Sequence, residues 1–145
     1  MEFITVEQFK EQPVEIQKVF IDWWKPSELD LVSIPFAESI LCKYRYPTTI
    51  EYYEHEGENI ISTIDERKLL KSNTILLFTE GQLRKFIEDK TNTKIETSLT
   101  VYKQYALWLV KVKGEDYRTF DTREEDLLQA YWKVACMIAK ESLNG

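Results

Sequence analysis

The chain has 145 residues, of which 43% are apolar and 13% aromatic, and its formal net charge at pH 7 is −6. This length and composition fit one folded domain and exclude an intrinsically disordered chain, which would carry fewer apolar and aromatic residues. The acidic balance disfavours direct binding to nucleic acid, and no apolar run reaches the length of about 18 residues that a membrane span needs.

Three helix starts are indicated by one recurring signal, a threonine placed three residues before Gln or Glu. In this capping box the threonine hydroxyl accepts a hydrogen bond from the backbone N–H three residues on, and the Gln or Glu side chain reaches back to the threonine N–H. The boxes begin at Thr5, Thr79 and Thr122. Each precedes apolar residues at helical spacing, so each predicts the start of a helix.

Residues 1–26 are predicted to form a pair of helices. The first is short and meets Pro13, which can serve as the first residue of the second, because its missing N–H costs nothing there. Trp24 is rotated by about 100° from Trp23 around the helix axis, so the two rings cannot both lie at the centre of one face. We expect both at the core or its edge; the alternative makes Trp24 an exposed anchor for a partner.

The segment from residue 27 to residue 75 gives a weaker signal. The stretches "DLVSI", "TTIEYY" and "NTILLFT" have the composition of strands. The stretch "GENIISTIDERKLLK" suits either a strand or a helix, because short apolar runs are ambiguous by periodicity alone.

Residues 73–143 are predicted to form a core of the order helix, strands, helix. After the helix capped by Thr79, residues 94–112 alternate with the period of two that is typical of strands, and "YRTF" indicates a third. Strands so closely spaced favour an antiparallel meander.

The last helix is expected to begin at Thr122, with Glu124, Glu125 and Asp126 in its first turn and Lys140 in its last. Its polar residues fall on one narrow stripe, which predicts that most of the helix is buried against the sheet.

These elements predict an α+β fold in one domain spanning residues 1–145. It consists of an N-terminal helix pair and a small antiparallel meander packed against two helices, including the buried C-terminal helix. We expect Trp108 and Trp132 both to be largely buried.

Three segments, in the order "FTEGQLRKFIEDKT", "ALWLVKV" and "DLLQAYWKVACMIAKE", resemble small uncharacterised proteins of phages and prophages of Gram-positive bacteria, in particular the phage ABA sandwich type. The N-terminal stretch "QPVEIQKVFIDWWKP" is similar to proteins from the same genomes. The resemblance covers residues 73–143 and, more loosely, 5–26. It implies a genomic setting and a fold, and it brings no activity, cofactor or catalytic residue.

The only histidine of the chain, His55, lies among glutamates in "IEYYEHEGE". A zinc site needs several His or Cys ligands at close spacing, and a calcium loop needs spaced Asp and Asn oxygens around a glycine. Neither pattern is present, nor is a phosphate-binding glycine motif or a nucleophile elbow. We therefore expect no metal or other cofactor, and interpret this stretch as an exposed hairpin or loop with Gly57 at its turn.

A non-enzymatic protein that binds a host or phage protein is the function that we expect, acting in host takeover or against a defence system. Candidate contact residues are Trp24, Tyr52 and Tyr53, because Tyr and Trp dominate the hot spots of protein interfaces. We expect no direct contact with nucleic acid or membrane, and a homo-oligomer is an open alternative.

Two other functions stay open. An acidic mimic of nucleic acid would block a restriction or CRISPR effector by presenting carboxylates in place of phosphates, here those of Glu51, Glu54, Glu56 and Glu58. A small hydrolase would instead use His55 with neighbouring carboxylates.

A bacterial host cytoplasm is the expected compartment. The two cysteines, Cys42 and Cys136, form no disulfide framework pattern and are interpreted as free thiols. Cys136 lies near the polar stripe of the last helix, which indicates a small residue at the core boundary rather than a nucleophile. The N-terminus lacks the basic and then apolar plan of a secretion signal.

Overall fold

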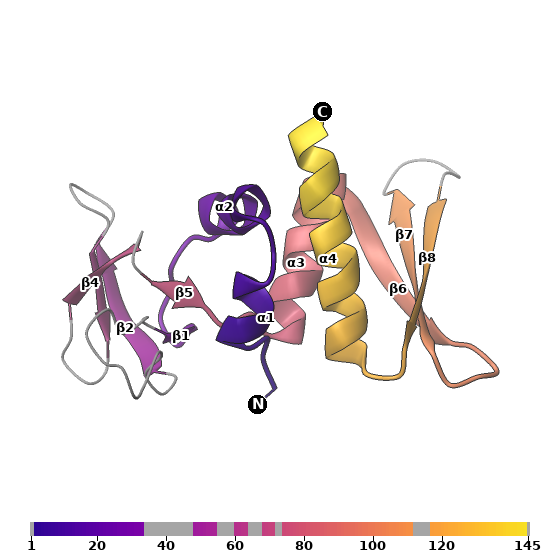
Figure 1. Cartoon of the computed structure of the whole chain (residues 1–145), viewed down its shortest axis with the longest axis horizontal. Coiled ribbons are helices and arrows are strands. Elements are labelled where there is room, and N and C mark those ends of the chain that lie inside the picture. The colour runs from indigo at the N-terminus through magenta and orange to yellow at the C-terminus, as the bar shows by residue number, and fades with distance from the viewer. Residues whose placement is uncertain are drawn as a thin grey trace.

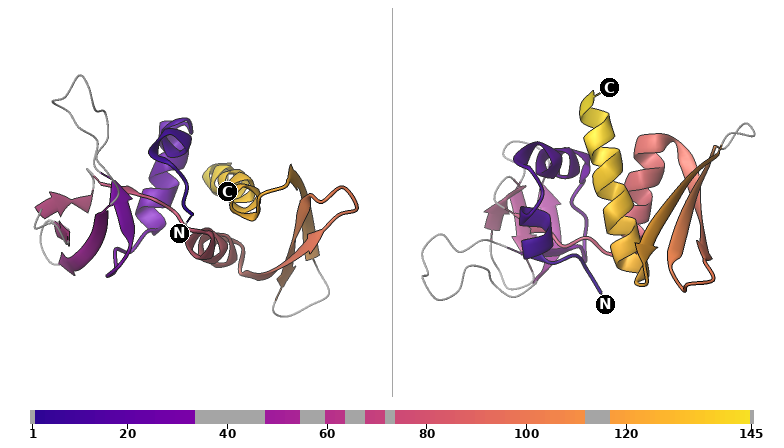
Figure 2. Two further views of the ribbon diagram at one scale, coloured as in Figure 1. Left: turned by 90° about the horizontal axis from the view of Figure 1, so that it is seen from below. Right: turned by 45° about the vertical axis from the view of Figure 1, so that its right-hand side comes forward.

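Helices lie between two antiparallel sheets in the computed structural model of the chain (Figure 1). The structure describes residues 2–33, 48–54, 60–63, 68–71, 74–111 and 117–144. Figure 2 shows the same layering from two further directions, with the meander of the last strands on one side of the helices and the other sheet opposite. The predicted α+β fold is confirmed.

The N-terminal helix pair consists of α1 (Val6–Lys10) and α2 (Val14–Trp23). The capping box at Thr5 is present in full, because its hydroxyl accepts from the N–H of Gln8 and the Gln8 side chain accepts from the N–H of Thr5. Pro13 occupies the N-cap of α2, one residue earlier than predicted. It still lies where the absence of an N–H costs no helical hydrogen bond.

A five-stranded antiparallel sheet has the strand order β4-β3-β2-β1-β5. Its strands are β1 (Leu31–Ser33), β2 (Thr48–Glu54), β3 (Ile60–Thr63), β4 (Lys68–Leu70) and β5 (Ile75–Leu76). Each of the three stretches with strand composition thus contains a strand, although only Ile75 and Leu76 of "NTILLFT" belong to it. The ambiguous stretch contributes β3 and β4, because pairing with β2 supplies the ladder that its sequence alone does not specify.

The second half of the described chain follows the predicted order of helix, meander and helix. Its elements are α3 (Glu80–Thr91), β6 (Thr93–Leu99), β7 (Tyr105–Lys111), β8 (Tyr117–Glu124) and α4 (Leu127–Asn144). The three strands form a sheet of the order β6-β7-β8, which confirms the meander. The capping box of α3 at Thr79 is also present in full.

The core is centred on the fully buried ring of Phe20 in α2. Its centroid lies 4.5 Å from that of Phe86, 5.2 Å from that of Phe78 and 5.2 Å from that of Trp132. Offset and edge-to-face packing at these separations is favourable for aromatic rings. Trp132 is 6% exposed, as expected for the largely buried helix α4. The aromatic cluster therefore joins the N-terminal pair to α3 and α4.

The predicted start of the last helix is wrong. Thr122 lies in β8, where its buried hydroxyl donates to the backbone oxygen of Tyr105 at 2.6 Å. The helix begins at Leu127, and Asp126 Oδ1 accepts from the N–H of Gln129 at 2.9 Å. Glu124 is therefore a strand residue, and Glu125 and Asp126 precede the first turn.

Lys140 also lies before the last turn, because the helix continues to Asn144. Both Thr122 and Asp126 could cap a helix by their residue types. Because β8 pairs with β7 as far as Glu124, only Asp126 is free to cap the helix.

The expectation that Trp108 is largely buried is also wrong, since this side chain is 36% exposed. In β7 the alternate residues Leu107 and Leu109 face the core and are buried, so Trp108 points to the opposite face. Both sets of alternate residues in this strand contain apolar side chains, and the sequence does not show which set meets the helices.

Candidate protein-docking surface

The hairpin that joins β6 to β7 carries an apolar tip, defined here as residues 99–104. Val101 is 92% exposed and Tyr102 is 77% exposed, and Leu99 beside them is also exposed. The part of the chain that the structure describes exposes nine large apolar side chains, and five of them lie between residues 99 and 117. The meander is therefore where exposed apolar surface is concentrated.

An ordered turn holds this tip. The N–H of Lys103 donates to the oxygen of Thr100 at 3.0 Å, and the N–H of Thr100 donates to the oxygen of Gln104 at 2.8 Å. The hydroxyl of Thr100 accepts from the N–H of Gln104 at 3.3 Å. Lys103 has a φ of 58°, the left-handed conformation that closes a hairpin of this kind. Val101 and Tyr102 thus occupy the two central positions of a turn, where Gly, Pro, Asn and Asp are the usual residues.

The outer face of the meander adds a pair of aromatic side chains. The rings of Trp108 and Tyr117 have centroids 5.5 Å apart, and the indole N–H of Trp108 donates to the hydroxyl of Ser98 at 3.1 Å. Tyr117 is 65% exposed. Two exposed aromatic rings fixed by neighbours present contact area that loses little entropy on binding, as at interface hot spots.

The structure places Trp24, the predicted aromatic anchor, inside the core. This side chain is 3% exposed, and its indole N–H donates to Asp30 Oδ2 at 2.9 Å. The ammonium group of Lys71 lies 5.9 Å from the centre of its ring, and burial lowers the pKa of that lysine. The anchor interpretation of Trp24 is therefore wrong, and its interpretation as a core residue holds.

The other predicted contact residues belong to β2 or follow it. Glu51 is exposed, and Tyr53 is half-buried against the core. Tyr52 and Glu54 are backbone positions of β2 whose side chains lie outside the described part of the structure. Glu56 and Glu58 lie outside the described residues, as do His55, Gly57 and Cys42. The acidic stretch 51–58 and the histidine therefore stay predictions.

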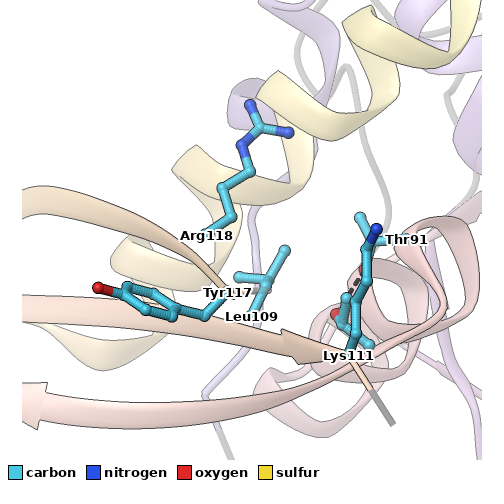
Figure 3. A pocket seen from close by; sticks show the side chains of 6 residues that line it. Thr91, Leu109, Lys111, Tyr117 and Arg118 are labelled. Atoms are coloured by element: carbon cyan, nitrogen blue, oxygen red, sulfur yellow. Dashed lines mark hydrogen bonds between the residues drawn. The ribbon is translucent and has the colours of Figure 1, made fainter. Parts of the chain in front are cut away.

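A pocket of about 490 Å³ lies at one end of the meander, beside the last residue of α3, and residues of β6, β7 and β8 line it (Figure 3). Leu109 forms part of its wall, and Lys111 and Arg118 line it. The hydroxyls of Thr91 and Thr93 lie 2.6 Å apart, and Thr91 donates to the oxygen of Ile87 at 2.7 Å, so Thr93 is the donor of the pair.

Both terminal nitrogens of the Arg118 guanidinium donate to the carboxylate of Glu141. This hydrogen bonding lowers the pKa of Glu141 and raises the pKa of Arg118. The threonine hydroxyls and the guanidinium of this pocket are thus engaged in hydrogen bonds within the protein.

A second hollow of about 480 Å³ lies between the start of α2 and the C-terminal half of α4. Ile16, Met137 and Leu143 give it an apolar lining, and Cys136 is half-buried in it. Desolvation raises the pKa of the Cys136 thiol to about 12, which keeps the thiol protonated at neutral pH. Cys136 is therefore a boundary residue, as predicted, and not an activated nucleophile.

Sequence reasoning missed the tip and the outer aromatic pair. The stretch "TVYKQ" continues an alternating pattern, which predicts that Val101 lies within a strand. The signal that distinguishes the turn is the polar pair Thr100 and Gln104 flanking it, which closes the loop through backbone and hydroxyl hydrogen bonds.

Comparisons with known proteins give no match to a family model, a curated protein or a solved structure. The resemblance to small phage and prophage proteins therefore stays a prediction. In the described parts of the chain, no helix is both long and apolar enough to cross a membrane. Among the same residues, no three His, Cys, Asp or Glu side chains are grouped so that they could hold a metal ion.

Proposed function

We propose that this chain is a non-enzymatic docking protein that inserts the apolar tip of its β6–β7 hairpin into an apolar pocket on another protein. The observation that carries the proposal is the position of Val101 and Tyr102. Both side chains are largely exposed at the centre of a turn that three hydrogen bonds hold in place.

Exposed apolar residues at a turn cost solubility, and the turn itself does not require them, because polar residues and glycine close hairpins equally well. An ordered tip also reduces the entropy that is lost on binding, since the turn is already in one conformation. The tip is therefore better suited to binding another protein than to closing the fold.

The chemistry of the tip defines its partner. Lys103 is the only charged residue among residues 99–104, so apolar burial rather than ion pairing would supply the affinity. The partner is a folded protein with an apolar pocket wide enough for one valine and one tyrosine side chain. The resemblance to phage and prophage proteins is the reason to expect a bacterial host or phage protein in this role, in host takeover or against a defence system.

A photo-crosslinking amino acid at position 102, in protein expressed in a Gram-positive host, identifies the partner, which is then purified for titration. We expect Val101→Ala and Tyr102→Ala each to weaken binding by at least about 2 kcal/mol, or roughly 30-fold, as at interface hot spots. Val14→Ala is the matched control, because Val14 is 74% exposed on a different surface, at the start of α2. The proposal fails if the two tip variants bind as tightly as the control.

The acidic-mimic alternative predicts a response to salt that differs from that of binding through the tip. Binding through Glu51 and its acidic neighbours would weaken steeply between 0.05 and 0.5 M salt (roughly, from a Debye length of about 10 Å at 0.1 M), and Glu51→Lys would slow association. Binding through the tip would tolerate that salt range and that substitution. The same titration series therefore separates the two functions.

A further inference from the structure

The two edges of the meander differ in how they are protected. At the β6 edge, the backbone N–H of Ile95 donates to Glu88 Oε2 at 2.9 Å, and its backbone oxygen accepts from Arg84 at 2.8 Å. Both of these side chains belong to α3, and they also pair with each other at 3.5 Å. These two α3 side chains therefore occupy the outward backbone groups of Ile95 and interrupt this edge for pairing with another strand.

The β8 edge is open, as the alternating direction of backbone groups along antiparallel strands shows. Because the N–H and oxygen of Ile95 point away from β7, its opposite residue Leu109 points its own backbone groups toward β8. Tyr105 lies four residues before Leu109 in β7, so its backbone groups should also point toward β8. Its oxygen does accept from the hydroxyl of Thr122 in β8. The residue that pairs with Leu109 is Arg118, so its backbone groups point inward, toward β7.

The intervening residues of β8 must then point their backbone groups outward, and these are Tyr117, Thr119 and Asp121. Among the residues that the structure describes, none forms a hydrogen bond with these outward N–H and oxygen groups. The open stretch ends after Asp121, because a bulge follows, Arg123 has a φ of 58° and the oxygen of Thr122 accepts from Lys133 at 2.9 Å.

We propose that the β8 edge pairs with the β8 edge of a second copy of this chain, antiparallel about a twofold axis that passes beside Thr119. In this register Thr119 lies opposite Thr119 of the second copy, and Tyr117 lies opposite Asp121. Every outward N–H and oxygen of the three residues then has a partner, and the two meanders form one continuous sheet.

The side chains of β8 are compatible with this self-pairing. No like charges lie opposite one another, since Arg118 faces Phe120 of the second copy and Asp121 faces Tyr117. Arg118 already lies over the ring of Phe120 in its own chain, at 4.5 Å from the ring centre. A register centred on Phe120 would oppose Tyr117 to Arg123, whose left-handed backbone cannot continue the ladder.

The dimer does not rest on the proposed function, because residues 99–104 join β6 to β7 and do not belong to the paired edge. It has a consequence for the outer face of the meander. The rings of Trp108 and Tyr117 lie 5.5 Å apart in each copy, and the pairs of both copies would lie on one continuous sheet face.

Thr119→Pro is the first test, with Thr119→Val as its matched control. The N–H of Thr119 points outward, so proline removes no bond to β7 and is tolerated at a strand edge, but it removes the central bonds of the proposed dimer. We expect light scattering after size exclusion to show a mass that rises to that of a dimer with concentration for the wild type and for Thr119→Val. Thr119→Pro should stay monomeric with an unchanged circular dichroism spectrum.

Charge at the same position gives a second test that does not depend on proline. Thr119→Glu and Thr119→Lys each place like charges at the twofold axis, so each variant alone should be monomeric. An equal mixture should form a heterodimer, because Glu then lies opposite Lys.

The proposal is overturned if the wild type keeps the monomer mass at every concentration, or if Thr119→Pro dimerises as the wild type does. A dimer that both charge variants leave intact would also overturn it. If Thr119→Lys dimerises alone while Thr119→Glu does not, the axis does not pass beside Thr119.

Discussion

The indole N–H of Trp24 donates to Asp30 Oδ2 at 2.9 Å, which joins the end of α2 to the start of the five-stranded sheet. The same carboxylate accepts from the backbone N–H of Ser27 at 3.0 Å and from the side chain of Gln82 at 3.0 Å. Gln82 is the residue that completes the capping box of α3. One aspartate thus connects α2, the loop before β1 and the N-terminus of α3.

Asp30→Ala should therefore destabilise the fold by about 2–3 kcal/mol, because it leaves the buried indole N–H of Trp24 without an acceptor. Unfolding in urea measures the change. Glu28→Ala is the control, since Glu28 is an exposed residue of the same loop, and it should change stability by less than about 0.5 kcal/mol. Equal losses in the two variants would contradict the role of Asp30 as a connecting group.

Phe20→Ala should cost about 3–5 kcal/mol, because it empties the centre of the aromatic cluster. Phe20→Leu should cost less, since leucine fills more of the space but loses the ring contacts with Phe78, Phe86 and Trp132. Thermal unfolding, followed by the near-ultraviolet signal of the tryptophans, gives both values. A loss below about 1 kcal/mol in the alanine variant would show that this cluster is not the centre of the core.

Asp126→Ala should destabilise α4 by about 1 kcal/mol, the usual cost of removing a side-chain cap. Asp126→Asn should retain most of that stability, because its amide oxygen still accepts from the N–H of Gln129. Glu125→Ala, one residue earlier, serves as the control and should be nearly neutral in chemical unfolding. A larger loss in the control than in Asp126→Ala would place the cap elsewhere.

Arg118 and Glu141 give a pH dependence of known sign. Hydrogen bonding to Arg118 lowers the pKa of Glu141 below its ordinary value of about 4.5. A lowered pKa in the folded state stabilises the protein above that ordinary value, and the stabilisation is lost as the pH falls through the folded-state pKa. Both side chains are half exposed, so the contribution should stay below about 1 kcal/mol.

Arg118→Ala should accordingly lower the free energy of unfolding at pH 7, and the difference from the wild type should shrink below pH 4.5. A carboxyl titration by nuclear magnetic resonance should show the pKa of Glu141 moving back toward its ordinary value in the variant. Lys18→Ala, an exposed change in α2, controls for the loss of a positive charge. A difference that grows toward acid would contradict the sign of this linkage.

Features that depend on neighbours along the chain follow from the local pattern of residues. The capping boxes at Thr5 and Thr79 formed as predicted, because the groups that satisfy each other are three residues apart. The meander of β6, β7 and β8 followed from alternation and from short connections, which leave antiparallel neighbours as the simplest arrangement.

Where two arrangements are locally acceptable, packing between elements that are distant in the sequence selects one of them. Alternation in β7 gives two apolar faces, and the packing of α3 and α4 selects Leu107 and Leu109 over Trp108 for the core. Thr122 and Asp126 are both acceptable caps, and pairing of β8 with β7 leaves only Asp126 at the start of a helix.

The exposure of Val101 and Tyr102 and the open edge of β8 have the same origin. Which apolar side chains and which backbone groups stay uncovered depends on contacts between elements that are distant in the sequence. Those contacts are absent from any local pattern of residues.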